Sequence, residues 1–354
     1  MPLKPTASVR QARETLRHLA ATAPPGAPLP AVRELGRQFG LHGSTLFRLC
    51  RELAEEGLLW QNAAGRFYPV QGRKRAVRGA PVCVLGRSMQ RWSRLYQEIL
   101  EGVSEVCAAN DSPLVFMTAS RLVQHPEPSL PPRFASPATQ ARELQALLQH
   151  APKGCAAYLL DHLWHERILA AAHWPGGERV QFLHAGQTLS SVAPDLPAGA
   201  RLALSHLQNL GYAEIWLIQP FVGDSAVTAM EQALIQAAGP FPVRLLPAPT
   251  PSERAQVFHQ ATTNPRQIGL VCCEDNVCLE LLELWRHANG PTHRTGLLAM
   301  QGTGVLSAPL TRLRYDYRRL GRSAAALALH GQPPGPVSPQ LIEGLTCQPG
   351  FKSP

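Results

Sequence analysis

Residues Leu29 to Val70 read LPAVRELGRQFGLHGSTLFRLCRELAEEGLLWQNAAGRFYPV, and their apolar spacing predicts two short helices. The first helix carries its apolar side chains on one face, at Leu29, Val32, Leu35 and Phe39. The second has a similar face, formed by Leu46, Leu49, Cys50, Leu53 and Ala54, and stops at Gly57. Because the turn between the helices is so short, they must cross steeply, which is the helix-turn-helix arrangement.

Two short β-prone runs, residues 58–60 and 67–70, follow these helices and are separated by Asn62-Ala63-Ala64-Gly65. This pattern predicts a β-hairpin, and a hairpin directly after a helix-turn-helix is a wing. Upstream, Ser8 can cap a further helix whose apolar face is Val9, Ala12, Leu16, Leu19 and Ala20. The sequence therefore predicts a three-helix head with a wing.

This head resembles the winged helix-turn-helix of the GntR regulators. The matching residues are Leu29-Pro30, Arg33-Glu34-Leu35, Gly40-Leu41, Thr45-Leu46, Leu53 and Gly57-Leu58-Leu59. Where that family often has arginines, this chain has Gly43 and Phe47, with Arg48 and Arg51 displaced from them. The resemblance implies binding to double-stranded DNA through Arg33, Ser44, Thr45, Arg48, Arg51 and Arg66.

The positive charge is concentrated in the same part of the chain. Residues 1–79 contain 13 Lys and Arg against five Glu, which gives +8 of the formal +9 of the whole chain. An excess confined to one end suits phosphate contact, because each neutralised phosphate releases condensed counterions. Residues 71–79, QGRKRAVRG, lack an apolar period and are predicted to form a basic linker.

The composition argues against several other classes of protein. No run of 18 apolar residues exists and the first residues have no apolar signal-peptide core, so we predict a cytoplasmic protein without a membrane span. The eight cysteines form no C-x-x-C pair and are predicted to be small buried side chains, without metal or disulfide. The pair His162 and His165 lacks further ligands at suitable spacing, so no metal site is predicted.

From residue 80 onward, short apolar runs alternate with helical patterns. The predicted strands are 82–85, 114–117, 156–160, 180–183, 215–218, 243–246, 268–272 and 296–300. The predicted helices are 96–109, 139–150, 166–173, 199–209, 226–238, 252–262 and 277–288. Continuous apolar strands that alternate with helices favour parallel sheets covered on both faces, that is, a doubly wound α/β architecture or a barrel.

This part resembles the ligand-binding domain of the LacI/GalR regulators, which has a periplasmic-binding-protein-like fold of two subdomains. The matching segments are Glu98-Ile99-Leu100-Glu101-Gly102-Val103, Ser191-Val192 with Asp195, Gly211-Tyr212, Asp275 with Cys278, Pro309-Leu310-Thr311-Arg312-Leu313 and Leu320-Gly321-Arg322. A GntR-type head on a LacI-type sensor resembles the arabinose repressors of bacilli. The predicted boundaries are 1–70 for the head, 71–79 for the linker, 80–340 for the sensor and 341–354 for a C-terminal tail. Within the sensor we predict that residues 80–190 with 294–311, and 192–290 with 312–340, form the two subdomains.

The resemblance implies a small molecule, with a carbohydrate as the default, bound between the subdomains. The predicted ligand-binding residues follow the strands of the sheets: Ser88, Arg91, Trp92, Asp161, His162, Trp164, Asp275 and Gln301. Asp275 is the one hydroxyl-accepting anchor of the family that is retained here, since Asp224 to Met230 contains no arginine and the last strand ends in Met300-Gln301-Gly302.

Three functional classes are compatible with such a chain: a transcription regulator that responds to a ligand, a solute-binding protein or other sensor without DNA binding, and an aminotransferase-type GntR regulator. The aminotransferase-type regulator needs a lysine that binds its cofactor. Lys153 is the only lysine between Lys74 and Lys352, which argues against this class. No phosphate-binding glycine loop or nucleophile set is present, so we predict no enzyme activity and no cofactor. We predict a transcription regulator, in particular a repressor, that binds a pseudo-palindromic operator as a homodimer.

Overall fold

The computed structural model divides into two units, residues 1–77 with 326–335 and residues 78–325 with 336–354. It describes residues 7–22, 29–55, 58–61, 66–69, 79–86, 94–124, 133–183, 186, 189–220, 225–273, 275–287, 294–301, 310–332, 335 and 337–347. Within these ranges, no helix is both long and apolar enough to cross a membrane.

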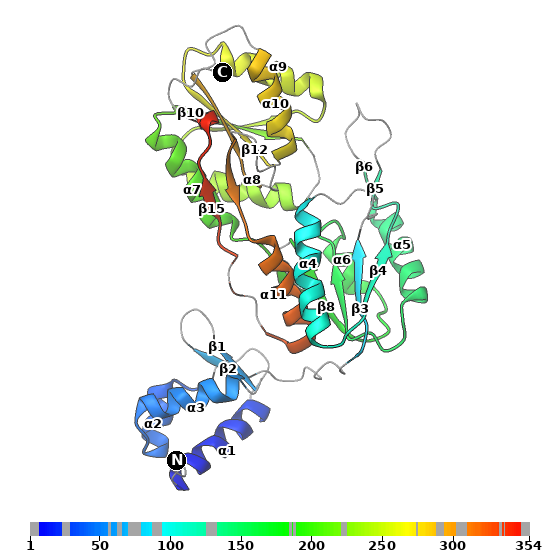
Figure 1. The fold of residues 1–354 in the computed structure, drawn as a ribbon, viewed down its shortest axis with the longest axis vertical. Coiled ribbons are helices and arrows are strands. Elements are labelled where there is room, and N and C mark those ends of the chain that lie inside the picture. The colour runs from blue at the N-terminus through cyan, green and yellow to red at the C-terminus, as the bar shows by residue number, and fades with distance from the viewer. Residues whose placement is uncertain are drawn as a thin grey trace. The chain divides into compact units, whose positions relative to one another are not determined.

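The head has the predicted helices and hairpin, in the predicted order (Figure 1). Its elements are α1 Ala7–Thr22, α2 Val32–Phe39, α3 Gly43–Glu55, β1 Leu59–Gln61 and β2 Phe67–Pro69. β1 pairs antiparallel with β2. One apolar cluster joins Leu16 of α1, Leu35 of α2, Leu46 and Leu53 of α3 and Phe67 of β2. The periodic apolar residues of the sequence are therefore the core that fixes the angle between the helices.

The turn between α2 and α3 depends on Gly40. This residue ends α2 with a φ of 62°, a left-handed conformation that costs glycine little. The amide of Leu41 then donates to the carbonyl oxygen of Gly36 at 3.0 Å, and the amide of Thr45 donates to His42 O at 3.0 Å. The chain is thus reversed within a few residues and α3 begins at once.

The first sheet of the second unit has the strand order β4-β3-β7-β8-β9 and is parallel throughout. The strands are β3 Val82–Gly86, β4 Leu114–Thr118, β7 Ala157–Leu160, β8 Glu178–Phe182 and β9 Ser190–Val192. Their helices are α4 Arg94–Ala109, α5 Pro137–His150 and α6 Glu166–Ala171, and a small hairpin joins β5 Val123–Gln124 to β6 Arg133–Phe134. Leu144 of α5 and Leu169 of α6 share a core with Cys83 and Leu85, so these helices cover one face.

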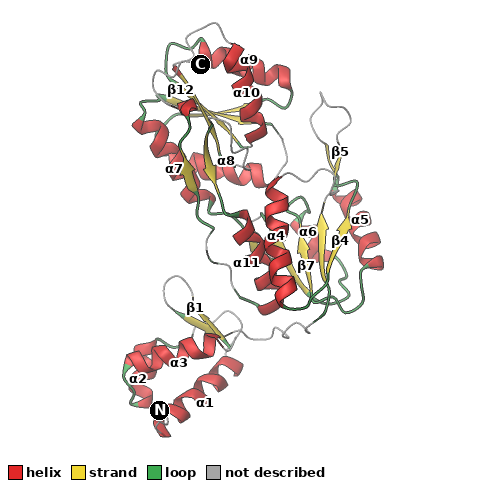
Figure 2. Ribbon diagram, viewed as in Figure 1, coloured by secondary structure: helices red, strands yellow, loops and turns green. Residues whose placement is uncertain are grey.

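The second sheet has the order β11-β10-β12-β13-β14-β15 and is parallel except for its last pair. In Figure 2 its strands are yellow and the helices that cover it are red. The strands are β10 Glu214–Gln219, β11 Val243–Pro247, β12 Ile268–Cys272, β13 Thr295–Ala299, β14 Thr311–Arg314 and β15 Gln340–Ile342. The helices are α7 Leu196–Asn209, α8 Ser225–Ala238, α9 Pro251–Thr262, α10 Asp275–His287 and the short η3 Leu345–Cys347. Phe258 of α9 and Leu281 of α10 pack with Leu270 on one face, while Leu207 of α7 lies against Gly269 on the other.

Helix α11, Tyr317–His330, follows β14 of the second sheet in sequence but packs on α4, which belongs with the first sheet. The two helices approach so closely that a Cβ atom on Gly321 would overlap the carbonyl group of Ile99, and one on Gly102 would overlap Arg318 O. Glu105 of α4 accepts hydrogen bonds from Arg318 and Arg322 of α11. The glycines of two LacI-like segments are thus explained by one helix crossing.

The predicted division into subdomains is wrong in two places. Strand β13, predicted to join the first sheet, pairs with β12 from Ile268↔Thr295 to Cys272↔Ala299 in the second. Helix α11, predicted for the second subdomain, packs on α4. The chain therefore passes between the subdomains after β9, between β14 and α11, and between α11 and β15. β12 and β13, which flank residues 288–293, both belong to the second sheet, so the subdomain boundary predicted at residue 290 is wrong.

The predicted C-terminal tail is also partly wrong. Residues 340–342 form β15, which pairs antiparallel with β14. Farther on, the hydroxyl of Thr346 donates to Leu297 O at 2.7 Å and accepts from the amide of Thr311 at 2.9 Å. Residues 340–342 thus form the edge strand of the second sheet, and Thr346 satisfies backbone groups of the interior strands β13 and β14.

The prediction of buried cysteines is confirmed, since all eight are buried free thiols. Burial raises the pKa of Cys50 and of Cys107 to about 11, so both thiols are neutral near pH 7. In the first sheet, the Sγ atoms of Cys83 and Cys155 lie 3.2 Å apart. No group of three or more His, Cys, Asp or Glu side chains placed to hold a metal ion occurs among the residues described above.

Candidate nucleic-acid interface and ligand site

The exposed face of α3 gathers four side chains at helical spacing. Ser44, Phe47, Arg48 and Arg51 are exposed, at positions i, i+3, i+4 and i+7. Leu46, Leu49, Cys50 and Leu53 of the same helix lie in the core of the head. The side chain of Arg48 is 70% exposed, although its Nε lies 3.7 Å from Glu52 Oε1. Because the core fixes the opposite face, α3 presents this polar and cationic face outward.

The N-terminal end of α3 is organised by His42. Its Nδ1 atom lies 2.8 Å from Ser44 Oγ, and its carbonyl oxygen accepts from the amide of Thr45. Ser44 is exposed and Thr45 is half-buried at this end of the helix. The N-terminal end of a recognition helix is where base edges and phosphates are contacted. Ser44 and Thr45, two of the predicted DNA-binding residues, therefore lie at the N-terminal end of α3.

The remaining two arginines lie beside the same face. Arg33 of α2 and Arg66, just before β2, are exposed and line a hollow of about 450 Å³ together with Phe47. The ring of Phe47 is 39% exposed and meets the ring of Phe67 edge to face, with centroids 5.6 Å apart. Phe47 was not among the predicted contacts, although it stands where the GntR family often has an arginine, and that position is the signal in the sequence that could have found it. The wing tip, 62–65, and most of the basic linker lie outside the described residues.

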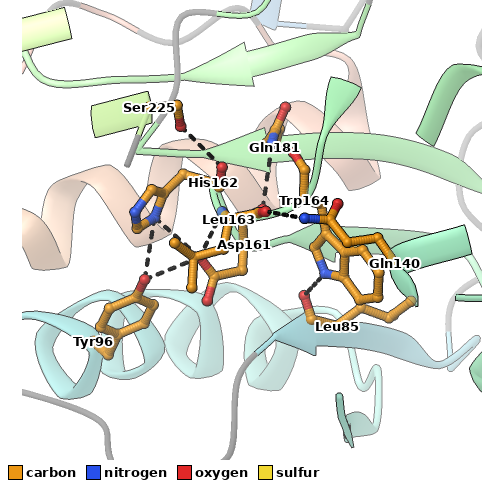
Figure 3. Close-up of polar contacts among 9 residues, drawn as sticks. All are labelled: Leu85, Tyr96, Gln140, Asp161, His162, Leu163, Trp164, Gln181 and Ser225. Atoms are coloured by element: carbon orange, nitrogen blue, oxygen red, sulfur yellow. Dashed lines mark hydrogen bonds and ion pairs between the residues drawn. The ribbon is translucent and has the colours of Figure 1, made fainter. Parts of the chain in front are cut away.

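In the second unit, Asp161 is the centre of a buried polar network at the end of β7 (Figure 3). Its Oδ1 accepts from the hydroxyl of Tyr96 at 3.0 Å and from the amide of Leu163 at 3.1 Å. The Nδ1 atom of His162 lies 3.0 Å from the same oxygen and 3.2 Å from Tyr96 Oη. Asp161 is 0% exposed and His162 is 6% exposed. A buried carboxylate in such a network is held in one position.

Trp164 is a core residue, which corrects its prediction as a ligand-facing loop residue. Its side chain is 2% exposed, and its indole N–H donates to Leu85 O at 3.1 Å. The surrounding loop is fixed by two buried glutamines. Gln140 donates to Leu163 O at 3.2 Å, and Gln181 donates to Trp164 O at 3.0 Å. The loop that carries Asp161 and His162 is therefore rigid, and Trp164 helps to anchor it.

One hydrogen bond connects the ends of the two sheets. The hydroxyl of Ser225, at the start of α8 after β10, donates to the carbonyl oxygen of His162 at 3.0 Å (Figure 3). In parallel sheets, all strands end at the same edge. This contact therefore places the carboxyl edge of the first sheet against that of the second. Open α/β sheets bind ligands beyond this edge.

The other predicted ligand residues are only partly described. Gln301 follows β13 at the same edge of the second sheet and is 8% exposed. Asp275 is the first residue of α10, directly after the β12 edge, and its side chain is outside the described part. Ser88, Arg91 and Trp92 lie in residues 87–93, which the structure does not describe.

Comparison with known proteins bears on both parts. Residues 9–63 match the family model of the IclR helix-turn-helix domain, which confirms a helix-turn-helix in the head. The matching family is IclR and not GntR, so the predicted GntR type is not confirmed. Comparison of the sequence with curated proteins yields no match.

Solved structures resemble the second part of the chain. A LacI family transcriptional regulator from Enterococcus faecium with bound ribose has a TM-score of 0.58 at 15% identity, over 76% of this chain and 99% of that one. A LacI family regulator from Weissella paramesenteroides with bound glucose has a TM-score of 0.60 at 13% identity, over the same shares. A PurR family regulator from Vibrio parahaemolyticus gives 0.55 at 15% identity, over 75% and 98%. The predicted two-subdomain α/β fold is confirmed.

Proposed function

We propose that this protein is a transcription regulator that responds to a small molecule and acts in the cytoplasm, most simply as a repressor. The head, residues 1–70, binds double-stranded DNA, residues 71–79 are the linker, and the sensor runs from residue 80 to Cys347. The observation that carries the proposal is the exposed, cationic face of α3 in a chain whose remainder has the fold of LacI-type regulators. We propose no enzyme activity and no cofactor.

In the proposed complex, α3 lies in the major groove. Ser44, Thr45, Arg48 and Arg51 face bases or the nearest phosphates, while Arg33 and Arg66 hold the DNA backbone on either side. The head buries too little surface for operator-level affinity, so two chains bind the two halves of a pseudo-palindrome. A GntR-like arrangement of these contacts is part of the proposal, because the matching residues Arg33-Glu34-Leu35 and Gly40-Leu41 form α2 and its turn.

The proposed effector binds between the carboxyl edges of the two sheets. His162, Gln301 and Asp275 belong to these edges, and Ser88, Arg91 and Trp92 follow β3 in the sequence. Trp164 is left out because it is a core residue, and Asp161, which is fully buried, holds His162 in position. Carboxylate, imidazole and amide groups suit the hydroxyls of a sugar. The regulators with bound ribose and glucose support a carbohydrate as the ligand class.

The proposed mechanism is a population shift. A ligand that touches both edges binds the closed arrangement of the subdomains more tightly and so favours closure. Closure changes how two sensors present their heads, and the heads must meet half-sites about 34 Å apart or a multiple of that distance. A coupling of about 1–3 kcal/mol between effector and operator is typical of such systems.

The test begins with the full-length protein and a random duplex library. We expect selection to recover a two-fold symmetric sequence that binds more tightly than random DNA at fixed salt. Ribose, glucose and other sugars are then titrated into the labelled complex while anisotropy is followed. Selection without any sequence preference overturns the regulator and favours a sensor or solute-binding protein that does not bind DNA. If the protein binds DNA selectively but responds to no sugar, the proposed DNA-binding function stands. The proposal that the effector is a carbohydrate is then wrong.

Asp275 provides a sharper test of the ligand site. If it contacts the effector, Asp275→Ala abolishes the response to the active sugar and leaves operator affinity without ligand unchanged. If Asp275 only caps α10, the variant has a lower unfolding midpoint and still responds at the wild-type sugar concentration. The second outcome removes Asp275 from the proposed site.

A further inference from the structure

Phe47 is an exposed aromatic residue in the middle of an otherwise polar face. Six large hydrophobic side chains are exposed among the described residues, and Phe47 is the only aromatic one, at 39% exposure. It lies between Ser44 and Arg51 on α3, next to Arg48. An isolated exposed hydrophobe is common on proteins, but this one occupies the centre of the proposed DNA-binding face.

The ring of Phe47 is held in place rather than free to move. It meets the ring of Phe67 edge to face, with centroids 5.6 Å apart and planes at 70°. Phe67 itself is 4% exposed, and its carbonyl oxygen accepts from the amide of Leu29 at 2.8 Å. Phe47 is therefore held against the core on one side, while 39% of its surface remains exposed. A fixed ring loses little conformational entropy when it binds.

The surroundings of the ring restrict what it can contact. Arg33 and Arg66 line the same hollow of about 450 Å³, and Arg48 is its neighbour on the exposed face. The Phe47 ring is thus surrounded by three arginines. Such a surface is complementary to one in which negative charges lie on either side of a small apolar group. The major groove has this pattern wherever a thymine occurs, because its C5 methyl group is the apolar feature of the base edges between two phosphate backbones.

We propose that Phe47 reads a thymine in each operator half-site by packing its ring on the C5 methyl group. This inference rests on the proposed function of the head. Phenylalanine has no side-chain donor or acceptor, so it cannot pair with guanine or adenine edges as arginine or glutamine does. Its contribution to specificity is then a preference for thymine over cytosine and over uracil at one position.

The experiment removes the methyl group from the DNA. Each thymine of the operator selected with the full-length protein is replaced in turn by deoxyuridine, symmetrically in both half-sites. Affinities are measured by anisotropy at fixed salt for wild type, Phe47→Leu and Phe47→Ala. We expect one thymine whose replacement weakens wild-type binding about fourfold per half-site, as for the loss of one buried methyl-sized group. In Phe47→Ala, the same replacement has no effect.

Leu58→Ala is the matched control. Leu58 is a similarly exposed apolar residue of the head, at 37%, and lies between α3 and β1 rather than on the α3 face. This variant should retain the full uracil penalty. Phe47→Leu keeps apolar packing against Phe67 and should retain part of it, which excludes unfolding of the head as the cause.

The outcomes separate the inference from the proposed function. A uracil penalty that is equal in wild type and Phe47→Ala, or the absence of any such penalty in wild type, overturns the role of Phe47 and leaves DNA binding intact. Phe47 is then only a packing residue between α3 and the hairpin. If the wild-type protein selects no duplex sequence, the proposed function as a DNA-binding regulator is wrong. The proposed contact between Phe47 and thymine is then wrong as well.

Discussion

Arg254 is a buried cation on α9. Its hydrogen bonds connect this helix to α10 and to the residues that follow β11. It is 8% exposed, its Nε and Nη2 atoms donate to Glu280 Oε2 at 3.0 and 2.8 Å, and Nη1 donates to Ala248 O and Pro249 O. It therefore joins α9 to α10 and to the end of β11. A lysine keeps the charge but cannot reproduce this fork of donors.

We therefore expect Arg254→Lys to lower the free energy of unfolding by about 1–3 kcal/mol, because buried carbonyl oxygens lose their donor. The midpoint of urea unfolding measures this. Arg286→Lys is the control, since Arg286 bonds Glu283 at 2.6 Å on an exposed helix face, where such pairs contribute about 0–1 kcal/mol. Equal shifts for both variants would show that the buried hydrogen bonds are not the cause.

Arg48 supplies a prediction for specificity. If it pairs with a guanine, Arg48→Ala weakens binding to the selected operator by about 1–3 kcal/mol and leaves binding to random duplex much less affected. Anisotropy with both DNAs gives the two losses. Losses of equal size would make Arg48 a phosphate contact.

For individual residues, the sequence predicted the positions of the exposed arginines better than those of the buried polar side chains. Arg48 and Arg51 could be placed because helical periodicity separates the exposed face of α3 from its core. Trp164 was misplaced because its partner, Leu85 O, is 79 residues away. The local sequence Asp161-His162-Leu163-Trp164-His165 has the composition of a polar loop, and nothing in it shows that the indole turns into the sheet.

Among the secondary-structure elements, the crossing of α4 and α11 depends on two glycines and on Glu105. Ile99 and Arg318 contribute backbone atoms to the contact, so a side chain on Gly102 or Gly321 cannot be accommodated by a change of rotamer. We expect Gly102→Ala and Gly321→Ala each to cost about 3 kcal/mol or more, at the upper end of overpacking. Ser104→Ala, at an exposed position of α4, should be close to neutral. Thermal unfolding of the three variants compares them, and neutral glycine variants would contradict the close crossing.

The arginines of α11 give this crossing a dependence on pH. Hydrogen bonds from Arg318 and Arg322 hold the pKa of Glu105 below its usual range. A depressed folded pKa stabilises the protein above the unfolded pKa, near 4.5, and this contribution is lost as pH falls through the lower folded value. Glu105→Gln should therefore be less stable than wild type at pH 7, and the difference should disappear in strong acid. A difference that is constant down to pH 2 would contradict this.

Elements with a strong apolar period were predicted nearly to the residue, as in β12, whose bounds 268–272 agree with the structure. The assignment of strands to sheets failed for β13. Every strand of a buried parallel sheet is apolar, so the sequence of one strand does not identify the strand with which it pairs. β14, with the sequence TRLR, was not predicted as a strand, since three of its four residues are polar and the hydrogen bonds of Thr311 go to Gly344 and Thr346, more than 30 residues away.

For the whole molecule, the proposed function requires two chains. The full-length protein, of 38.5 kDa, should therefore sediment at twice this mass at micromolar concentration, with or without operator. A variant that lacks residues 1–79 should remain dimeric if the contact lies in the sensor. If both proteins are monomers, the mechanism in which two heads bind together is wrong. If only the variant that lacks residues 1–79 is a monomer, the dimer contact lies in the head rather than in the sensor.

The position of α11 also determines when the first subdomain can be completed during synthesis. Its strands end with β9, yet the helix that packs on α4 through Gly102 and Gly321 follows the whole second sheet as far as β14. At about 5–20 residues per second, α11 leaves the ribosome many seconds after β9. Throughout that interval, the nascent chain exposes the glycine-lined face of α4. Messages truncated before residue 317 should therefore yield products that chaperones retain and proteases remove, even though every strand of the first sheet is present.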